Sequence, residues 1–173
     1  MSSRREFLRF GGVCAGIGAL GLTVPEMYSA EKFPGDVAIL NVALGLEHEA
    51  IAAYQAGAES QLLSADQLSM ALAFQKDHKR HRDTLSKFVR RFGGTAVEAK
   101  SQYDFGTITS AADILKLAQR LEQGAADAYL THAAKLESRE VLDAAAQVLV
   151  DEVRHTTVLK LLLGLPVTER PKY

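Results

Sequence analysis

The stretch DEVRH at residues 151–155 decides the fold, because nearly the same pentapeptide, DHKRH, stands at residues 77–81. Both stretches follow the pattern D-x-x-R-H, and a leucine comes four residues after each final histidine. A second pattern, L-E-x-x-A-x-x-A-Y, begins at Leu46 and again at Leu121. The L-E-x-x-A-x-x-A-Y pattern repeats at an offset of 75 residues and the D-x-x-R-H pattern at an offset of 74, and their order is the same in both halves. The chain is therefore predicted to contain two related halves that face each other across a pseudo-twofold axis.

These repeats lie on four predicted amphipathic helices. The helices are expected at about residues 36–60, 65–92, 111–136 and 139–163. Ser64 and Gln67 fit a capping box, in which each side chain satisfies a backbone N–H of the other residue. Gly93 and Gly94 are expected to end the second helix, and Gly164 the fourth. No alternating pattern typical of a strand extends beyond a few residues.

The lengths of the connections predict the topology. Short links between the first and second helices, and between the third and fourth, predict two antiparallel hairpins. The link from Gly93 to Ser110 is long and polar, and is expected to cross the bundle. The predicted fold is all-α: an antiparallel four-helix bundle with one long crossover between helices two and three.

Residues 1–30 are predicted to be an export signal, which leaves residues 31–173 for the bundle. Residues 3–8, SRREFL, resemble the twin-arginine export signal S-R-R-x-F-L. The apolar stretch that follows is short and glycine-rich for a membrane span. Ala30 fits the end of a cleaved signal, but Tyr28 is large where a small residue is usual. We therefore expect a bacterial, periplasmic protein exported by the twin-arginine translocase, and membrane-anchored if the signal is not cleaved.

Composition argues against several functional classes. The chain has 173 residues and a net charge of −1, which does not favour nucleic acid. The predicted second helix is basic, but it lacks the interleaved aromatic residues of a nucleic-acid platform. The only cysteine, Cys14, provides neither a disulfide framework nor a thiolate metal site.

The glutamates and histidines of the repeats are the candidate metal ligands. Residues three apart share one face of a helix, so Glu152 and His155 can both point into the bundle. Glu47 and Glu122 lie mid-helix among small and apolar residues, where a lone buried carboxylate would be costly or protonated. A shared metal ion removes that cost. The expected ligands are Glu47, His78, His81, Glu122, Glu152 and His155, with a core histidine as the alternative for His78.

The arrangement resembles the ferritin-like, carboxylate-bridged di-metal superfamily over about residues 34–164. Members of that superfamily place one glutamate on each of two helices and Glu-x-x-His on each of the other two. Within it, the chain is similar to the small exported ferritin-like domain proteins of bacteria. The DEVRH stretch also resembles the D-E-x-R-H of the di-iron oxygenase branch.

That resemblance implies partners for the ligands. Asp151 would hold His81, and Asp77 would hold His155, so that each carboxylate fixes the tautomer of an imidazole on the opposite hairpin. Arg80 and Arg154 would pair with these aspartates and limit the cost of burying them.

Two tyrosines accompany the predicted ligands. Tyr54 and Tyr129 each follow a predicted ligand glutamate by seven residues, two turns along the same helix face. They are expected to be core residues whose hydroxyl groups find a nearby carboxylate. The alternative is a role in hydrogen-bonding a ligand or carrying an electron.

The second predicted helix departs from the family pattern. His78 stands where the family has a glutamate that usually bridges the two metal ions. A neutral imidazole has one lone pair for a metal, and three carboxylates would leave one positive charge beside two divalent ions. Two ions bridged by Glu152, a single ion, and a weak second position all stay open. Iron is the first expectation, with zinc, manganese or copper as alternatives.

Three functions stay open from the sequence. The resemblance implies a di-iron oxidoreductase, ferroxidase- or peroxidase-like, that acts on O2, peroxide or ferrous iron. The histidine at position 78 favours a non-catalytic periplasmic metal-binding or buffer protein instead. A stress-protective bundle with a degenerate site is the third. A homodimer fits the helical hairpins, although no residue fixes the oligomeric state.

Overall fold

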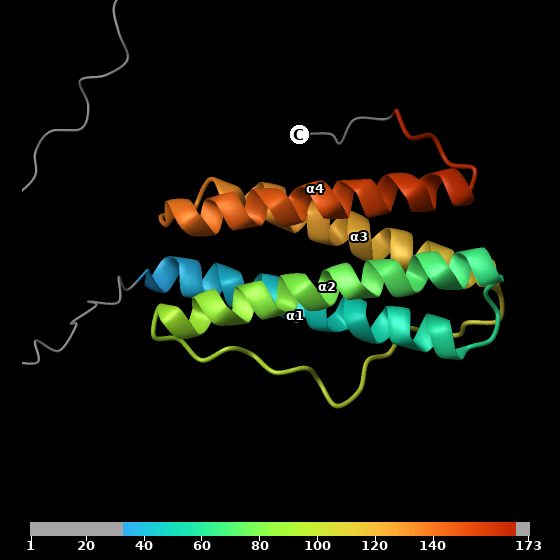
Figure 1. Ribbon diagram of the computed structural model, residues 1–173, viewed down its shortest axis with the longest axis horizontal. Coiled ribbons are helices and arrows are strands. Elements are labelled where there is room, and N and C mark those ends of the chain that lie inside the picture. The colour runs from blue at the N-terminus through green and yellow to red at the C-terminus, as the bar shows by residue number, and fades with distance from the viewer. Residues whose placement is uncertain (1–32, 169–173) are drawn as a thin grey trace, which may run out of the picture.

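The computed structural model describes residues 33–168, which form four α-helices and no strand. The helices are α1 (Pro34–Glu59), α2 (Ala65–Arg91), α3 (Ala111–Ala133) and α4 (Arg139–Leu162) (Figure 1). The predicted all-α bundle is confirmed, and each predicted boundary lies within three residues of the observed one. The predicted export signal at residues 1–30 lies outside the described residues.

Local signals set the ends of the helices. Ser64 accepts a hydrogen bond from the Gln67 backbone N–H at 3.3 Å, and the Gln67 side chain accepts from the Ser64 N–H at 3.0 Å. This is the predicted capping box, which satisfies backbone donors at the start of α2. Gly93 and Gly164 have φ angles of 79° and 67° just beyond α2 and α4. Glycine adopts this left-handed conformation readily, so both helices end there.

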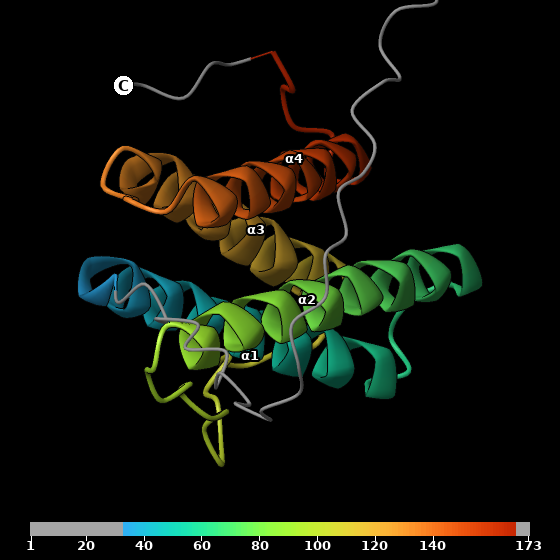
Figure 2. The same ribbon diagram turned by 60° about the vertical axis from the view of Figure 1, so that its left-hand side comes forward.

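The four helices form two hairpins. α1 packs along α2, and α3 packs along α4, while further contacts join α1 to α3 and α2 to α4. Figure 2 shows the hairpins as two layers, one above the other. The segment between α2 and α3 runs along the outer side of the α1–α2 hairpin toward the start of α3 (Figure 1). Asn41 fixes this segment, because its side chain donates to the Thr95 carbonyl and accepts from the Val97 N–H, each at 3.0 Å.

By length and composition, α1 is the one helix among the described residues that could span a membrane. In the bundle it packs along α2 and also contacts α3.

Two apolar clusters fill the interior, one toward each end of the bundle. One includes Leu44, Val89 and Val148, and the other includes Phe74 and Leu159. On every helix, the repeated polar residues stand between the residues of these two clusters. The polar residues therefore form a central layer that is closed by apolar side chains on both sides.

One buried carboxylate lies away from that layer and was not predicted. Asp36, fully buried near the start of α1, accepts the backbone N–H groups of Glu137 and Ser138, each at 2.9 Å. These N–H groups precede α4, so Asp36 ties the turn between α3 and α4 to the first hairpin.

Candidate metal centre

Six ionisable side chains meet in the central layer, and each is between 0 and 3% exposed. They come from all four helices: Glu47 from α1, His78 and His81 from α2, Glu122 from α3, and Glu152 and His155 from α4. The i, i+3 spacing on α2 and α4 turns both members of each pair inward. All six residues proposed as ligands from the sequence are thus brought together.

The six residues form two overlapping clusters. The first contains Glu47, His78, His81 and Glu152, and the second contains His78, Glu122, Glu152 and His155. Within each cluster, one nitrogen or carboxylate oxygen from every residue lies within 4.8 Å of the others. His78 and Glu152 belong to both clusters, so they lie between two candidate metal positions.

The ring of His78 contacts a glutamate on each side. Its Nδ1 lies 2.8 Å from Glu47 Oε2, and its Nε2 lies 3.1 Å from Glu122 Oε1. Tyr54 stacks on the ring at a centroid distance of 5.5 Å. Burial disfavours the imidazolium, but the contacts with Glu122 and Glu47 outweigh it and raise the pKa of His78 well above its usual value.

Two tyrosines hold the outer glutamates from across the pseudo-twofold axis. The Tyr129 hydroxyl on α3 donates to Glu47 Oε1 on α1 at 2.8 Å. The Tyr54 hydroxyl on α1 donates to Glu122 Oε1 on α3. Burial and the adjacent carboxylates raise the pKa of both tyrosines, so they stay protonated donors. These contacts agree with the expectation that each tyrosine hydroxyl group hydrogen-bonds to a nearby carboxylate.

The histidine–aspartate contacts implied by the resemblance are present between the hairpins. His81 Nε2 lies 3.1 Å from Asp151 Oδ2, and His155 Nε2 lies 3.3 Å from Asp77 Oδ2. An Nε2–H that donates to the aspartate leaves the lone pair on Nδ1. In both rings, Nδ1 is the nitrogen nearer the interior glutamates, at 3.2 Å from Glu152 Oε1 for His81 and 3.3 Å from Glu122 Oε2 for His155.

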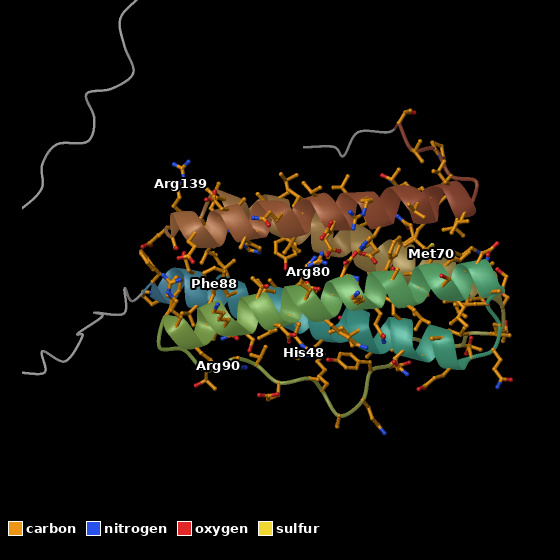
Figure 3. All side chains as sticks on the ribbon, in the orientation of Figure 1. His48, Met70, Arg80, Phe88, Arg90 and Arg139 are labelled. Carbon is orange, nitrogen blue, oxygen red and sulfur yellow. The ribbon has the colours of Figure 1, made fainter. Side chains whose placement is uncertain are left out.

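Two arginines close this arrangement at the surface. Arg80 contacts Asp151 at 2.7 Å and Asp77 at 2.8 Å. Arg154 contacts the same two aspartates, each at 3.0 Å. Figure 3 shows Arg80 between α2 and α4, and the side chains of both arginines are more than half exposed. The four residues form a ring of alternating charge that joins the two hairpins.

Burial and neighbouring charges shift the pKa values of the candidate ligands in different directions. Burial raises the pKa of Glu152 to about 9, and the neighbouring Glu122 and Glu47 carboxylates contribute to that rise. Burial also opposes ionisation of Glu122, but His155 and His78 hold its pKa well below the usual value. His81 has a pKa raised to about 10, because contacts with Glu152 and Glu47 outweigh the effect of burial. Glu152 is therefore the carboxyl group that is protonated at neutral pH without a metal ion.

The donor set fits a metal ion. Within residues 33–168, both carboxyl oxygens of Glu152 and Nδ1 of His81 are buried and have no hydrogen-bond partner. Buried polar atoms are nearly always paired, and leaving one unpaired costs about 1–3 kcal/mol. A cation between these atoms would satisfy all three together. Carboxylate oxygens and imidazole nitrogens suit iron, zinc and manganese.

Sequence comparison agrees with this geometry. Residues 35–165 match the model of the family described as ferritin-like domain. The chain belongs to the ferritin-like domain family. The chain is similar in structure to a conserved hypothetical protein from Mycobacterium tuberculosis, whose crystal structure matches it with a TM-score of 0.71 and 26% identity. The match covers 76% of this chain and 98% of that one. A search of curated proteins found no match.

Two features of this ferritin-like centre were not predicted. Phe74 stacks on His155, with ring centroids 3.9 Å apart and 23° between the planes. A groove of about 370 Å³ lies between α2 and α4, with Arg80, His81 and Asp151 among its lining residues. In the sequence, Phe74 cannot be told from the other apolar residues on its helix face. The groove depends on the distance between the two hairpins, which the sequence does not give. Neither feature leaves a signal in the sequence.

Proposed function

We propose that this ferritin-like protein binds two iron ions in the central layer and acts on ferrous iron, O2 or peroxide. The observation that carries the proposal is Glu152, a fully buried carboxyl group shared by two ligand clusters and without a hydrogen-bond partner among the described residues. When bound, the two irons would supply the electrons that reduce O2 or peroxide.

The protein side chains would prepare and protect this centre. Asp151 and Asp77 orient the imidazoles of His81 and His155 so that Nδ1 can ligate. The Tyr129 hydroxyl holds one oxygen of Glu47 and leaves the other facing the centre. The apolar clusters on both sides exclude water, which strengthens electrostatic interactions inside. The groove between α2 and α4 gives a small reactant a route as far as the His81–Asp151 pair.

Metal buffering is the second candidate, and a specific observation favours it. His78 lies between Glu47 and Glu122, where a carboxylate would bind two ions more readily than a neutral ring. A protein that holds one zinc or copper ion would need no reaction with O2. Replacing His78 by glutamate would then switch on reactivity of added ferrous iron toward O2.

We further propose that the chain is bacterial and is exported by the twin-arginine translocase to the periplasm. The support is the SRREFL stretch at residues 3–8. This route carries folded proteins, so the metal can be bound before export. Replacing Arg4 and Arg5 by lysine should retain the protein in the cytoplasm. Normal export of that variant would exclude this route.

Metal content tests the main proposal. The protein is purified from its export route, and its metals are counted by elemental mass spectrometry. Glu152→Ala is measured beside it, with Glu98→Ala, at an exposed loop position, as the matched control. We expect two irons per chain in the wild type and the control, a loss in Glu152→Ala, and peroxide-dependent turnover. One zinc or copper ion per chain would favour buffering, and no bound metal would exclude both functions.

A further inference from the structure

The two nitrogens of His78 face different clusters. Nδ1 is nearest Glu47, at 2.8 Å, and lies 3.8 Å from Glu152 Oε1, so it faces the cluster that also contains His81. Nε2 faces Glu122, a residue of the other cluster, at 3.1 Å. No other imidazole of the central layer belongs to both clusters.

Neighbouring rings keep His78 in this orientation. Tyr54 covers one face, with 28° between the ring planes. The rings of His81 and His155 meet it edge-on, at centroid distances of 5.8 and 5.5 Å. The side chain is only 1% exposed, so it cannot turn outward without opening the core. A metal ion in either cluster would therefore meet a ring nitrogen that is already in place.

The charge of the central layer also favours a bridging role for His78. Glu47, Glu122 and Glu152 supply three negative charges, one fewer than two divalent ions require for neutrality. An unbalanced charge in a site this buried is costly. Loss of the remaining ring N–H proton would make His78 an imidazolate, which carries the fourth negative charge and a lone pair on each nitrogen.

Resting on the proposed function, we infer that His78 bridges the two metal positions as an imidazolate. Nδ1 ligates the ion held with Glu47 and His81, and Nε2 ligates the ion held with Glu122 and His155. Each of the two divalent ions displaces the proton on the ring nitrogen that it binds, and both protons leave to solvent. The histidine thus replaces a bridging carboxylate in both geometry and charge.

A zinc-loaded crystal structure tests this inference directly. The purified wild-type chain is crystallised with zinc, and the ions are located by anomalous scattering. We expect two zinc ions, each about 2.0–2.1 Å from a different nitrogen of His78, the normal Zn–N distance. A single zinc ion per chain, or two ions of which only one touches the ring, would overturn the bridge and leave metal binding intact. Absence of zinc would overturn the bridge and the proposed function together.

Copper spectroscopy gives an independent readout. With one equivalent of Cu²⁺, the wild-type chain should show the full electron paramagnetic resonance signal of an isolated ion. With two equivalents, coupling through the ring should remove most of that signal.

The matched variant is His78→Gln, which keeps Glu152 but cannot bridge through a ring. It should bind the second copper more than about tenfold more weakly, or show two uncoupled signals. Coupling that persists in His78→Gln would assign the bridge to Glu152 and overturn the inference. Two uncoupled copper ions in the wild type would overturn it as well.

Discussion

Glu152 and Glu122 are equally buried, yet their removal should have opposite effects on the metal-free protein. Glu152→Leu deletes two oxygens that have no hydrogen-bond partner among the described residues. With a pKa raised to about 9, Glu152 is neutral at pH 7, so its 3.2 Å contact with His81 is not a pair of opposite charges, and the substitution removes none. We expect a gain of about 1–3 kcal/mol in the free energy of unfolding, the usual cost of an unpaired buried group. In a chain of this size, each kcal/mol corresponds to about 2–4 °C in Tm.

Glu122→Leu should lower the stability instead. The side chain accepts from Tyr54 and contacts a ring nitrogen of His78 and of His155, so leucine leaves these three groups without a partner. Breaking a buried network from one side costs about 3–5 kcal/mol.

The assay is urea unfolding followed by circular dichroism at pH 7, first with excess chelator and then with added metal. Metal at one hundred times its Kd should stabilise the wild type by about 2.7 kcal/mol for each ion bound. Glu152→Leu lacks a ligand of both clusters and should gain neither increment, whereas Glu122→Leu should lose only the increment of the cluster that contains Glu122. Equal destabilisation of the two metal-free variants would refute the reasoning, because Glu152 would then have partners that the structure does not show.

Three further predictions concern the same layer. Tyr129→Phe removes a hydrogen bond to buried Glu47 and should lower the free energy of unfolding by about 1.5–3 kcal/mol; an unchanged urea midpoint would contradict this. Asp151→Asn frees the His81 ring and should weaken metal binding about 10–100-fold by titration calorimetry, while equal affinity would show that the contact does not orient the ring. The raised pKa values of Glu152, His78 and His81 keep all three groups protonated at neutral pH, so metal must displace a proton from each one that it binds. Affinity should therefore rise by at least about tenfold per pH unit between pH 6 and 8, and a flat profile would argue against their ligand roles.

The fold was predictable because its signals are local. The Ser64 capping box and the glycines after α2 and α4 set helix ends from neighbouring residues alone. The convergence of the six candidate ligands followed from i, i+3 spacing and from the repeat. What the sequence could not show depends on distances between helices. The double contact of His78, the contact of Asp36 with the turn before α4, and the choice of carboxylate by each tyrosine all arise only when the hairpins pack.

Each hairpin supplies groups that complete the other. Asp77 and Tyr54 belong to the first and contact residues of the second, and Asp151 and Tyr129 do the reverse. A lone hairpin would therefore need a second copy of itself to assemble the same layer, and two identical copies would have to carry the same residue at equivalent positions. Joining both halves in one chain removes that constraint. It allows a histidine at position 78 to face a glutamate at position 152, an asymmetry that no dimer of identical hairpins could encode.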